Sequence, residues 1–335
     1  MSKPRIAILG IFVADLAFRA KRLPVMGETI LGEGFALGPG GKGSNQSVAA
    51  ARAGGDVSFI TKIARDSFGD IALKIWRDDG IDTSQVAFSD TSPTGAAFIF
   101  VSSETGDNAI IVETGASGTI TPDDVSVSAE TIKNAKVFIT QLETSVAAGR
   151  RGLELARKHG VTTIFNPAPA AKIDPMIYAL CDYVTPNETE VEVITGIAVH
   201  SLDDARRAGD AVLKLGTKTA LITLGAQGVL LHSKDQSVHV PTYKVKVVET
   251  TGAGDAFNGA FAVAIGEGKS PVDAARFGCA TAALSRPATR RFSWVFGWAR
   301  LGSRKVHPCR RCSRPSSLRH SMSSSLPKGN AAVPG

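Results

Sequence analysis

The stretch ETTGAGDAFNGAF, residues 249–261, places one carboxylate directly after three small residues and before an apolar run. Gly252, Ala253 and Gly254 predict a helix N-terminus with unpaired backbone N–H groups, which attracts an anion. A helix cap would explain Asp255 but not the three small residues. We therefore predict that Asp255 is a catalytic base, which takes the proton of a substrate hydroxyl as that hydroxyl attacks a phosphoryl group at this terminus.

The string GPGGKGSNQ, residues 38–46, contains a glycine pattern that also occurs in dinucleotide-binding turns. That motif requires the first strand–turn–helix unit of a sheet, whereas this string follows a later glycine-rich segment. It is not a phosphate-binding Walker loop either, because Gly43 follows Lys42. We predict a turn whose N–H groups, together with Lys42 and Asn45, hydrogen-bond a polyol, with a plain glycine-rich turn as the alternative.

Two more acids follow strand-like segments. Asp15 is predicted to end a first strand within RIAILGIFVADLAF, residues 5–18, and Glu143 follows the strand-like run in QLETS. A carboxylate at such a position can accept hydrogen bonds from two neighbouring hydroxyls of a sugar. The alternative for each is an exposed acid with no ligand.

The string PNETE, residues 186–190, places Asn187 and Glu190 where a strand enters a helix. They fit a helix cap and a first-turn acid. Glu190 also fits a site for hydrated Mg²⁺ beside triphosphate oxygens, because this ion keeps several waters and needs few protein ligands.

Farther along, ITLGAQG (222–228) predicts a strand that ends at Thr223, where a nucleotide could approach the backbone closely.

Strand-like and helix-like segments alternate along most of the chain, which predicts an α/β fold with a mostly parallel sheet between two helical layers. Glycine-rich strand-like segments within about 12–45 and 95–113 do not fit the alternation and predict a small β-sheet lid. In such folds ligands bind at the carboxyl ends of the strands.

The net charge of +7 over 335 residues arises from the C-terminal end, because residues 286–335 hold eleven basic and no acidic residues. The rest of the chain has 27 basic and 31 acidic residues and no basic stripe, so we expect no nucleic-acid partner. The sequence shows neither a signal peptide nor an apolar run of membrane-spanning length, and it has four scattered cysteines. These features predict a cytoplasmic protein without a membrane partner.

Residues 286–335 are rich in Arg, Ser and Pro and lack a sustained period. We predict one domain over 1–285, followed by a disordered tail. Our hypothesis is a reading-frame shift near Ser285, and the alternative is a genuine disordered tail.

Taken together, GGKGSNQSVAAARAGG (40–55), NPAPA, PNETE and ETTGAGDAFNGAF resemble the ribokinase-like (PfkB) carbohydrate kinases, over roughly residues 4–285. The resemblance implies a ribokinase-like sandwich with a β-lid that often forms a homodimer contact. It implies ATP as the phosphoryl donor, Mg²⁺, and often an activating monovalent cation such as K⁺. The implied reaction phosphorylates an alcohol group of a sugar, with ribose converted to ribose 5-phosphate as the leading case.

The resemblance also assigns roles by position. It implies that Asp255 is the base and that Gly252, Ala253 and Gly254 form the anion hole. The implied sugar contacts are Asp15, Gly41, Lys42, Asn45, Glu143 and Asp255. The implied nucleotide contacts are Asn187, Thr223, Gly225, Ala226, Gly228, Gly254 and Cys279. Glu190 matches the magnesium-associated acid, and Glu249, Thr251 and Ser285 are the implied ligands of the monovalent cation.

This chain departs from the family pattern at three places. Val13 stands where ribokinases commonly have Asn, which leaves another sugar or a nucleoside open as the substrate. Glu249 stands where the cation loop usually has Asp. The segment after Ser285 lacks the usual ending, so a catalytically impaired sugar-binding protein is a further alternative. A dinucleotide oxidoreductase is a last one, although the first strand lacks the glycine-rich turn that it requires.

Overall fold

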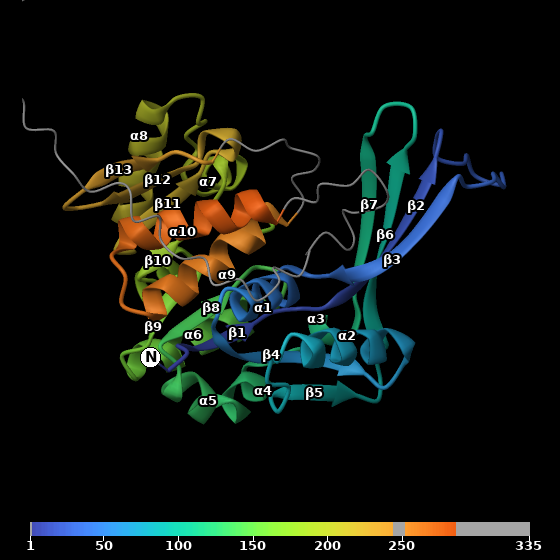
Figure 1. Ribbon diagram of the computed structural model, residues 1–335, viewed down its shortest axis with the longest axis horizontal. Coiled ribbons are helices and arrows are strands. Elements are labelled where there is room, and N and C mark those ends of the chain that lie inside the picture. Colours follow the sequence, from blue (N-terminus) through green and yellow to red (C-terminus); the bar gives the residue numbers. More distant parts are fainter. Residues whose placement is uncertain (1, 244–251, 286–335) are drawn as a thin grey trace, which may run out of the picture. The chain divides into compact units, whose positions relative to one another are not determined.

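The structure, a computed structural model, describes residues 2–243 and 252–285. Within that part of the chain, nine strands form one sheet (Figure 1). In order across the sheet they are β13 (Ser237–Val240), β12 (Val229–Ser233), β11 (Thr219–Thr223), β10 (Tyr183–Val184), β9 (Thr162–Phe165), β8 (Val137–Thr140), β1 (Arg5–Leu9), β4 (Asp56–Ala64) and β5 (Val86–Ser89). The strands from β11 to β5 are parallel, whereas β12 and β13 are antiparallel at one edge. The predicted mostly parallel sheet is therefore confirmed.

Successive side chains of a strand point to opposite faces of a sheet, and both faces of this sheet are apolar and covered by helices. In β1, Ile6 and Ile8 belong to one buried cluster, and Ala7 and Leu9 belong to another. The first cluster includes residues of α1 (Lys42–Arg52), α2 (Ser67–Asp78), α9 (Ala253–Gly266) and α10 (Pro271–Leu284). The second includes residues of α4 (Pro122–Val127), α5 (Ala129–Asn134), α6 (Val146–Lys158), α7 (Glu188–Thr195) and α8 (Leu202–Lys214). The predicted sandwich of two helical layers around a sheet is thus confirmed.

A second sheet of four strands stands beside the first in the described part of the chain (Figure 1). Its strands, in order, are β3 (Gly34–Gly40), β2 (Val13–Ala20), β6 (Thr94–Ser102) and β7 (Asn108–Thr114). β2 pairs antiparallel with β3 and parallel with β6, and β6 pairs antiparallel with β7. These strands fall in the two segments predicted to form a lid, and we call this sheet the lid sheet.

The prediction that Asp15 ends the first strand is wrong. β1 ends at Leu9, and Asp15 lies inside β2 of the lid sheet. Gly10 makes the crossing between the sheets possible, since a Cβ at this position would lie 2.6 Å from the Cα of Gly43. Apolar residues continue on both sides of the crossing, so the hydrophobic pattern does not reveal the break.

Other elements are short. Residues 122–134 form two short helices, α4 and α5, separated at Ser128. The strand that precedes the helix predicted at PNETE has only the two residues of β10, and α7 begins at Glu188. A short helix α3 (Gly115–Gly118) and 3-10 helices at Pro175–Leu180 and Gly225–Gln227 were not predicted.

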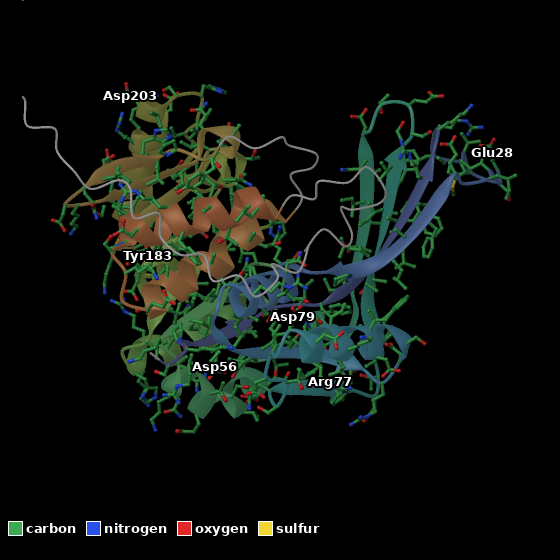
Figure 2. All side chains as sticks on the ribbon, in the orientation of Figure 1. Glu28, Asp56, Arg77, Asp79, Tyr183 and Asp203 are labelled. Atoms are coloured by element: carbon green, nitrogen blue, oxygen red, sulfur yellow. The ribbon has the colours of Figure 1, made fainter. Side chains whose placement is uncertain are left out.

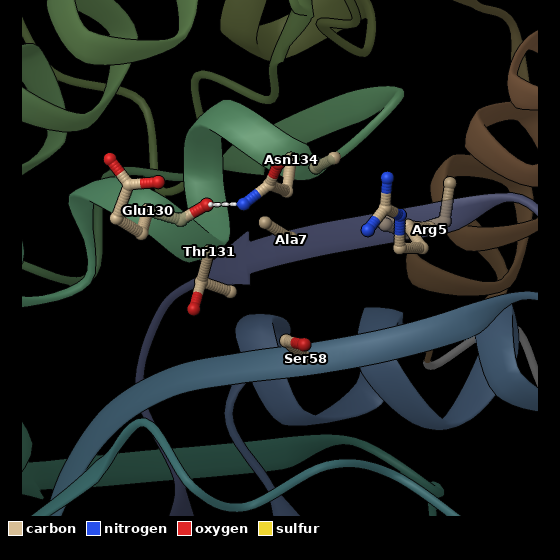
Figure 3. A pocket seen from close by; sticks show the side chains of 8 residues that line it. Arg5, Ala7, Ser58, Glu130, Thr131 and Asn134 are labelled. Carbon is tan, nitrogen blue, oxygen red and sulfur yellow. Dashed lines mark hydrogen bonds between the residues drawn. The ribbon is translucent and has the colours of Figure 1, made fainter.

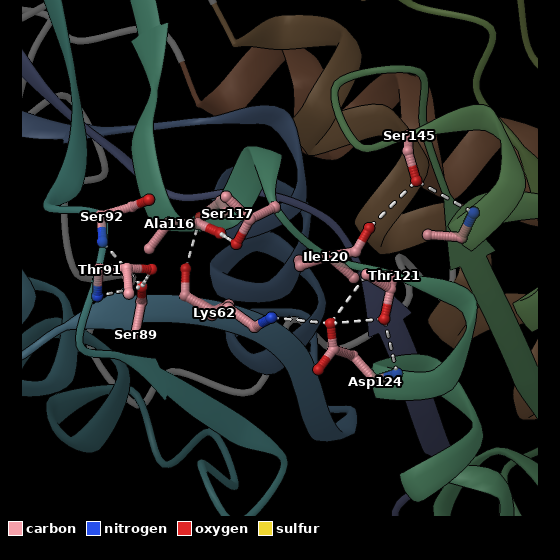
Figure 4. A network of polar contacts seen from close by, with 12 residues as sticks. Lys62, Ser89, Thr91, Ser92, Ala116, Ser117, Ile120, Thr121, Asp124 and Ser145 are labelled. Carbon is pink, nitrogen blue, oxygen red and sulfur yellow. Dashed lines mark hydrogen bonds and ion pairs between the residues drawn. The ribbon is translucent and has the colours of Figure 1, made fainter.

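A polar network fixes the segment that leads into the lid sheet (Figure 4). Lys62 Nζ forms an ion pair with Asp124 Oδ2 at 2.7 Å, and the same oxygen accepts hydrogen bonds from Thr121. Ser117 Oγ donates to the Lys62 carbonyl at 2.8 Å and accepts from the backbone N–H of Phe12 at 3.3 Å. The start of β2 is therefore attached to β4 and to α3.

On the other face, Arg52 at the end of α1 forms two hydrogen bonds with Asp79, of 2.8 and 2.9 Å, at the end of α2. Figure 2 labels Asp79 between these helices. In residues 2–243 and 252–285, none of the helices is long and apolar enough to cross a membrane. The predicted tail, residues 286–335, lies outside the described residues, and the boundary at residue 285 stays a prediction.

Candidate active site

The predicted catalytic stretch begins α9. Gly252 is its N-cap residue, with φ 76°, and the first turn contains Ala253, Gly254 and Asp255. No described side chain caps this end of the helix. A Cβ added to Gly252 or to Gly254 would meet no described atom within 4 Å. Packing against the described residues therefore does not require Gly254, and the helix N-terminus remains able to bind an anion.

Asp255 is 7% exposed and accepts two side-chain hydrogen bonds from α1. Asn45 Nδ2 donates to Oδ2 at 3.2 Å, and Gln46 Nε2 donates to Oδ1 at 3.0 Å. Burial raises the pKa of Asp255, while Lys42, Gln46 and Asn45 act in the opposite direction. The raised pKa suits a carboxylate that accepts a proton during a reaction near neutral pH.

Lys42 is half-buried at the start of α1, among three carboxyl groups. Burial lowers its pKa, but Asp255, Glu143 and Glu190 outweigh burial, so the pKa of Lys42 is raised overall. Its backbone N–H donates to Glu143 Oε2 at 2.7 Å. Among the described residues, no hydrogen bond or ion pair engages the Lys42 ammonium, which leaves this cation free to meet an anionic ligand.

Asp15 and Glu143 also fall in this region. Burial raises the pKa of Asp15 to about 7, and no hydrogen bond or ion pair joins its side chain to another described residue. Burial raises the pKa of Glu143 to about 7, against the lowering effect of Lys42, and Asp255 and Asp15 raise it further. The structure thus groups four predicted residues: Asp15 from the lid sheet, Lys42 from α1, Glu143 from the loop after β8 and Asp255 from α9.

Packing explains two glycines in the middle of the glycine-rich string, Gly40 and Gly41. A Cβ at Gly40 would collide with the Asp15 carboxylate, and a Cβ at Gly41, where φ is 87°, would lie 2.5 Å from the Ile11 carbonyl oxygen. The string begins inside β3 of the lid sheet and continues into α1, so it does not belong to the first strand of the large sheet, as predicted.

Asn187 and Glu190 form a capping box at the start of α7. Asn187 Oδ1 accepts from the Glu190 N–H, and Glu190 Oε2 accepts from the Asn187 N–H, both at 2.8 Å. Burial raises the pKa of Glu190, and the Asn187 N–H and Lys42 lower it. The structural interpretation of both residues is therefore confirmed, and Glu190 Oε1 has no hydrogen-bond partner among the described residues.

Most of the predicted nucleotide residues lie at the end of β11, whereas Cys279 lies in the core. Thr223 ends β11 and pairs with Asn187, and Gly225 and Ala226 lie in the exposed turn that follows. Gly228 has φ 101°, and a Cβ there would collide with the Val240 carbonyl, so the turn itself requires glycine. Cys279 is 4% exposed in the core of the large sheet, where burial raises its pKa to about 11.

The predicted monovalent-cation residues can be placed only in part. Glu249 and Thr251 lie outside the described residues. Ser285 follows α10, and its hydroxyl donates to the Ala282 carbonyl at 2.9 Å. In the described ranges, no group of three or more His, Cys, Asp and Glu side chains could hold a metal ion.

Gln46 is a site residue that the sequence prediction missed. It is fully buried, and it contacts Asp255 and Asn166 although they lie 209 and 120 residues away along the chain. The only sequence signal is its place directly after Asn45 in the glycine-rich string.

Cavities elsewhere do not coincide with this site. The cavity in Figure 3 has a volume of about 260 Å³ and lies at the opposite, N-terminal end of β1, beside α5. Arg5, Ser58, Glu130 and Asn134 line it, and Asn134 Nδ2 donates to the Glu130 carbonyl at 2.8 Å. None of the predicted site residues lines this cavity.

The sequence and the fold match a known class of proteins. Residues 3–289 match the pfkB family of carbohydrate kinases, and the chain belongs to this family.

Named relatives are consistent with that membership. A ribokinase of Mus musculus is 42% identical over 260 residues, which cover 77% of this chain and 80% of the relative. A deoxyribokinase of Salmonella typhi is 38% identical over 258 residues, which cover 77% and 84%. The structure of Arabidopsis thaliana ribokinase complexed with ribose and ATP matches with a TM-score of 0.79 and 30% identity, covering 85% of this chain and 93% of that one.

Proposed function

We propose that this chain is an ATP-dependent kinase that phosphorylates the primary hydroxyl of a pentose, with ribose as the first candidate. The observation that carries the proposal is the buried Asp255 carboxylate in the first turn of α9, beside an N-terminus that no described side chain caps. A carboxylate and an anion-binding terminus next to each other suit a hydroxyl nucleophile that attacks a phosphoryl group.

In the proposed step, the sugar hydroxyl oxygen forms a bond to the γ-phosphorus, and the bond from that phosphorus to the β–γ bridging oxygen breaks. ADP leaves with the electron pair, and the hydroxyl proton passes to Asp255. Residues 252–254 stabilise the charge on the transferring group through backbone N–H groups and the helix dipole. The Lys42 ammonium, which has no hydrogen bond or ion pair with a described residue, supplies further positive charge.

The sugar is proposed to bind Asp15, Lys42, Asn45 and Glu143, with Gly41 giving the backbone close approach. Two of these carboxyl groups have pKa values near 7 because of burial. Hydrogen bonds from sugar hydroxyls would offset that burial and favour the ionised form.

ATP is proposed to lie along the ends of β10 and β11, against Asn187, Thr223, Gly225, Ala226, Gly228 and Cys279. Glu190 fits a magnesium site, because one of its oxygens is not used by the capping box and Mg²⁺ needs few protein ligands. Bound there, the ion would neutralise charge on the phosphates. K⁺ activation through Glu249, Thr251 and Ser285 is a proposal from the family resemblance. A cytoplasmic location is also a proposal, and it rests on the composition of the sequence.

A second candidate substrate is 2-deoxyribose. Val13 is 3% exposed and lies on the same face of β2 as Asp15, two residues along the strand. An apolar side chain offers no hydrogen bond to a hydroxyl, so loss of one sugar hydroxyl would cost little binding energy there. A relative at 38% identity is named deoxyribokinase. We expect Val13→Asn to raise the ratio of kcat/KM for ribose over 2-deoxyribose about tenfold. An unchanged ratio would show that Val13 does not determine the preference between ribose and 2-deoxyribose.

The test of the proposed function is sugar-dependent ADP release by the full chain with ATP and Mg²⁺, on ribose, 2-deoxyribose and other sugars. Asp255→Asn keeps the shape of the side chain but cannot accept the proton, and we expect kcat to fall about 10²- to 10⁴-fold. Thr163→Val, at the start of β9, is the matched buried variant and should keep its kcat. Activity that survives in Asp255→Asn would contradict the proposed role.

A further inference from the structure

Three polar side chains form a row along the edge of the large sheet that holds the site. Each is the first residue after a strand: Gln141 follows β8, Asn166 follows β9 and Thr185 follows β10. The parallel register aligns the last residues of these strands, so the three residues lie beside one another. Their exposed fractions are only 2%, 7% and 1%. A fully buried polar row costs stability unless its groups are hydrogen-bonded.

The row holds the amide of Gln46 in one orientation. Gln141 Nε2 donates to Gln46 Oε1 at 2.6 Å, and Gln46 Nε2 donates to Asn166 Oδ1 at 3.2 Å. The same Nε2 donates its other proton to Asp255 Oδ1 at 3.0 Å. A flipped Gln46 amide would place its oxygen against two acceptors and its nitrogen against the nitrogen of Gln141. The orientation of Gln46 therefore follows from its surroundings.

The same row reaches the first turn of α9 by a second route. Asn166 Nδ2 donates to the Thr185 carbonyl at 2.9 Å, and Thr185 Oγ1 donates to Asn258 Oδ1 at 2.7 Å. Asn258 Nδ2 then donates to the Gly254 carbonyl at 2.9 Å. One row of sheet residues thus contacts both the Asp255 carboxylate, through Gln46, and the backbone of the predicted anion hole, through Asn258.

We propose that Gln46 is a positioning residue, which fixes the direction and favours the ionised form of the Asp255 carboxylate while Gln141 and Asn166 fix Gln46. The inference rests on the proposed function, in which Asp255 is the base. Gln141 Oε1 is buried and has no hydrogen-bond partner among the described residues. The one hydrogen bond that the described residues give the Gln141 side chain is the one to Gln46, so this side chain is placed to hold Gln46.

The proposed role of Gln46 predicts the direction in which the pKa of Asp255 changes when Gln46 is replaced. Gln46 donates to the charged form of Asp255, so its loss should make the carboxylate bind a proton more tightly. The other charged groups that act on Asp255 are Lys42, which favours the ionised form, and Glu143 and Glu190, which oppose it. All three remain in a Gln46 variant, so the acid limb of the kcat profile should move to higher pH.

The experiment uses the full chain and compares Gln46→Met, Gln141→Met and the double variant with wild type. Methionine keeps an unbranched side chain of similar size but makes none of these hydrogen bonds. We expect Gln46→Met to lower kcat about 10- to 100-fold and to move the acid limb up by about one pH unit. The KM for the sugar should change less than about threefold, because Asp15, Lys42 and Glu143 are intact. Gln141→Met should show a smaller change in the same direction.

The double variant distinguishes a positioning role of Gln141 from a general loss of stability. Since Gln141 acts through Gln46, the double variant should be no slower than Gln46→Met alone. Thr163→Val loses a buried hydroxyl in the same sheet and should leave the kcat and the acid limb unchanged. Gln46→Met with wild-type kcat and an unmoved acid limb, or multiplicative effects of the two substitutions, would overturn the inference.

Wild type and Asp255→Asn are measured first, so that a failure of the proposed function can be distinguished from a failure of the inference about Gln46. If wild type releases no ADP with any sugar, the proposed function fails. The titration of Asp255 is then followed by NMR of ¹³C-labelled aspartate, with Asp255→Asn identifying the signal. A midpoint that moves to higher pH in Gln46→Met supports the inference about Gln46, and an unmoved midpoint overturns it.

Discussion

At the residue scale, the site gathers carboxyl groups that burial makes hard to ionise. Burial raises the pKa of Asp15 and of Glu143 to about 7, and a half-buried Lys42 lies among their neighbours. For a carboxyl group with a raised pKa, the folded state binds the proton more tightly than the unfolded state. The contribution to stability is therefore fully present below about pH 4 and is lost as the pH rises through about 7. A bound sugar would restore the lost stability by donating hydrogen bonds to the ionised carboxylates.

Asp15 gives the residue-scale prediction. Asp15→Asn should raise the KM for the sugar about 10- to 100-fold, because it removes charge-assisted hydrogen bonds, while kcat changes little. In wild type, this KM should rise as the pH falls below about 7, and the rise should be shallower in Asp15→Asn, with Glu143 still titrating. Initial rates from pH 5.5 to 8.5 measure both effects. Asp107→Asn, on the exposed β6–β7 turn, is the matched control, and an equal loss there would contradict the prediction.

Single residues also show what the sequence could predict of the site. Asp255 and the glycines before it were found because a helix start with three small residues has few structural explanations. Gln46 was missed because its hydrogen-bond partners Gln141, Asn166 and Asp255 are 95 to 209 residues away, and only the fold brings them together. The position of Asp15 was also predicted wrongly, since an apolar run does not reveal which of two sheets a residue joins.

At the element scale, the alternation of strands and helices was enough to predict the parallel sheet and its helical layers. The order of the strands was not predictable in the same way. β8 lies beside β1, although more than 120 residues separate them, and β10 contributes only two residues. Such pairings depend on contacts across the whole chain, which the local hydrophobic pattern does not contain.

The first turn of α9 supplies the element-scale prediction. A methyl group on Gly254 would meet no described atom within 4 Å, and alanine favours a helix by up to about 1 kcal/mol over glycine. Gly254→Ala should therefore keep or raise the melting temperature, yet lower kcat/KM for ATP at least about tenfold by keeping the phosphoryl group from the backbone. Gly149→Ala in α6, where a methyl would make only ordinary contacts, should gain similar stability and keep its activity. Equal activity of the two variants would refute a phosphate site at Gly254.

At the whole-molecule scale, the lid sheet has two unlike faces. Asp15 lies on one face, whereas Phe18, Phe35, Phe98 and Ile111 lie on the other, by strand alternation and register. We call these four residues the lid patch. They are 40%, 53%, 37% and 70% exposed, and the ring of Phe18 lies 5.0 Å from that of Phe35 and 5.7 Å from that of Phe98. Clustered exposed aromatic side chains of this kind commonly mark an interface.

The lid patch leads to the prediction that the protein is a homodimer, with the two lid sheets in contact. A charge within this patch would be buried without a partner, so Phe35→Glu should dissociate the dimer, and light scattering after size-exclusion chromatography should show the mass fall to about 35.0 kDa. Val127→Glu, an equally charged change at an exposed apolar residue of α4, should leave the mass of the dimer unchanged. Because the Asp15 face is not altered, monomeric Phe35→Glu should still bind the sugar, with any loss of affinity reporting how far the partner supports the lid. A wild-type protein that elutes as a monomer at micromolar concentration would rule out this use of the patch.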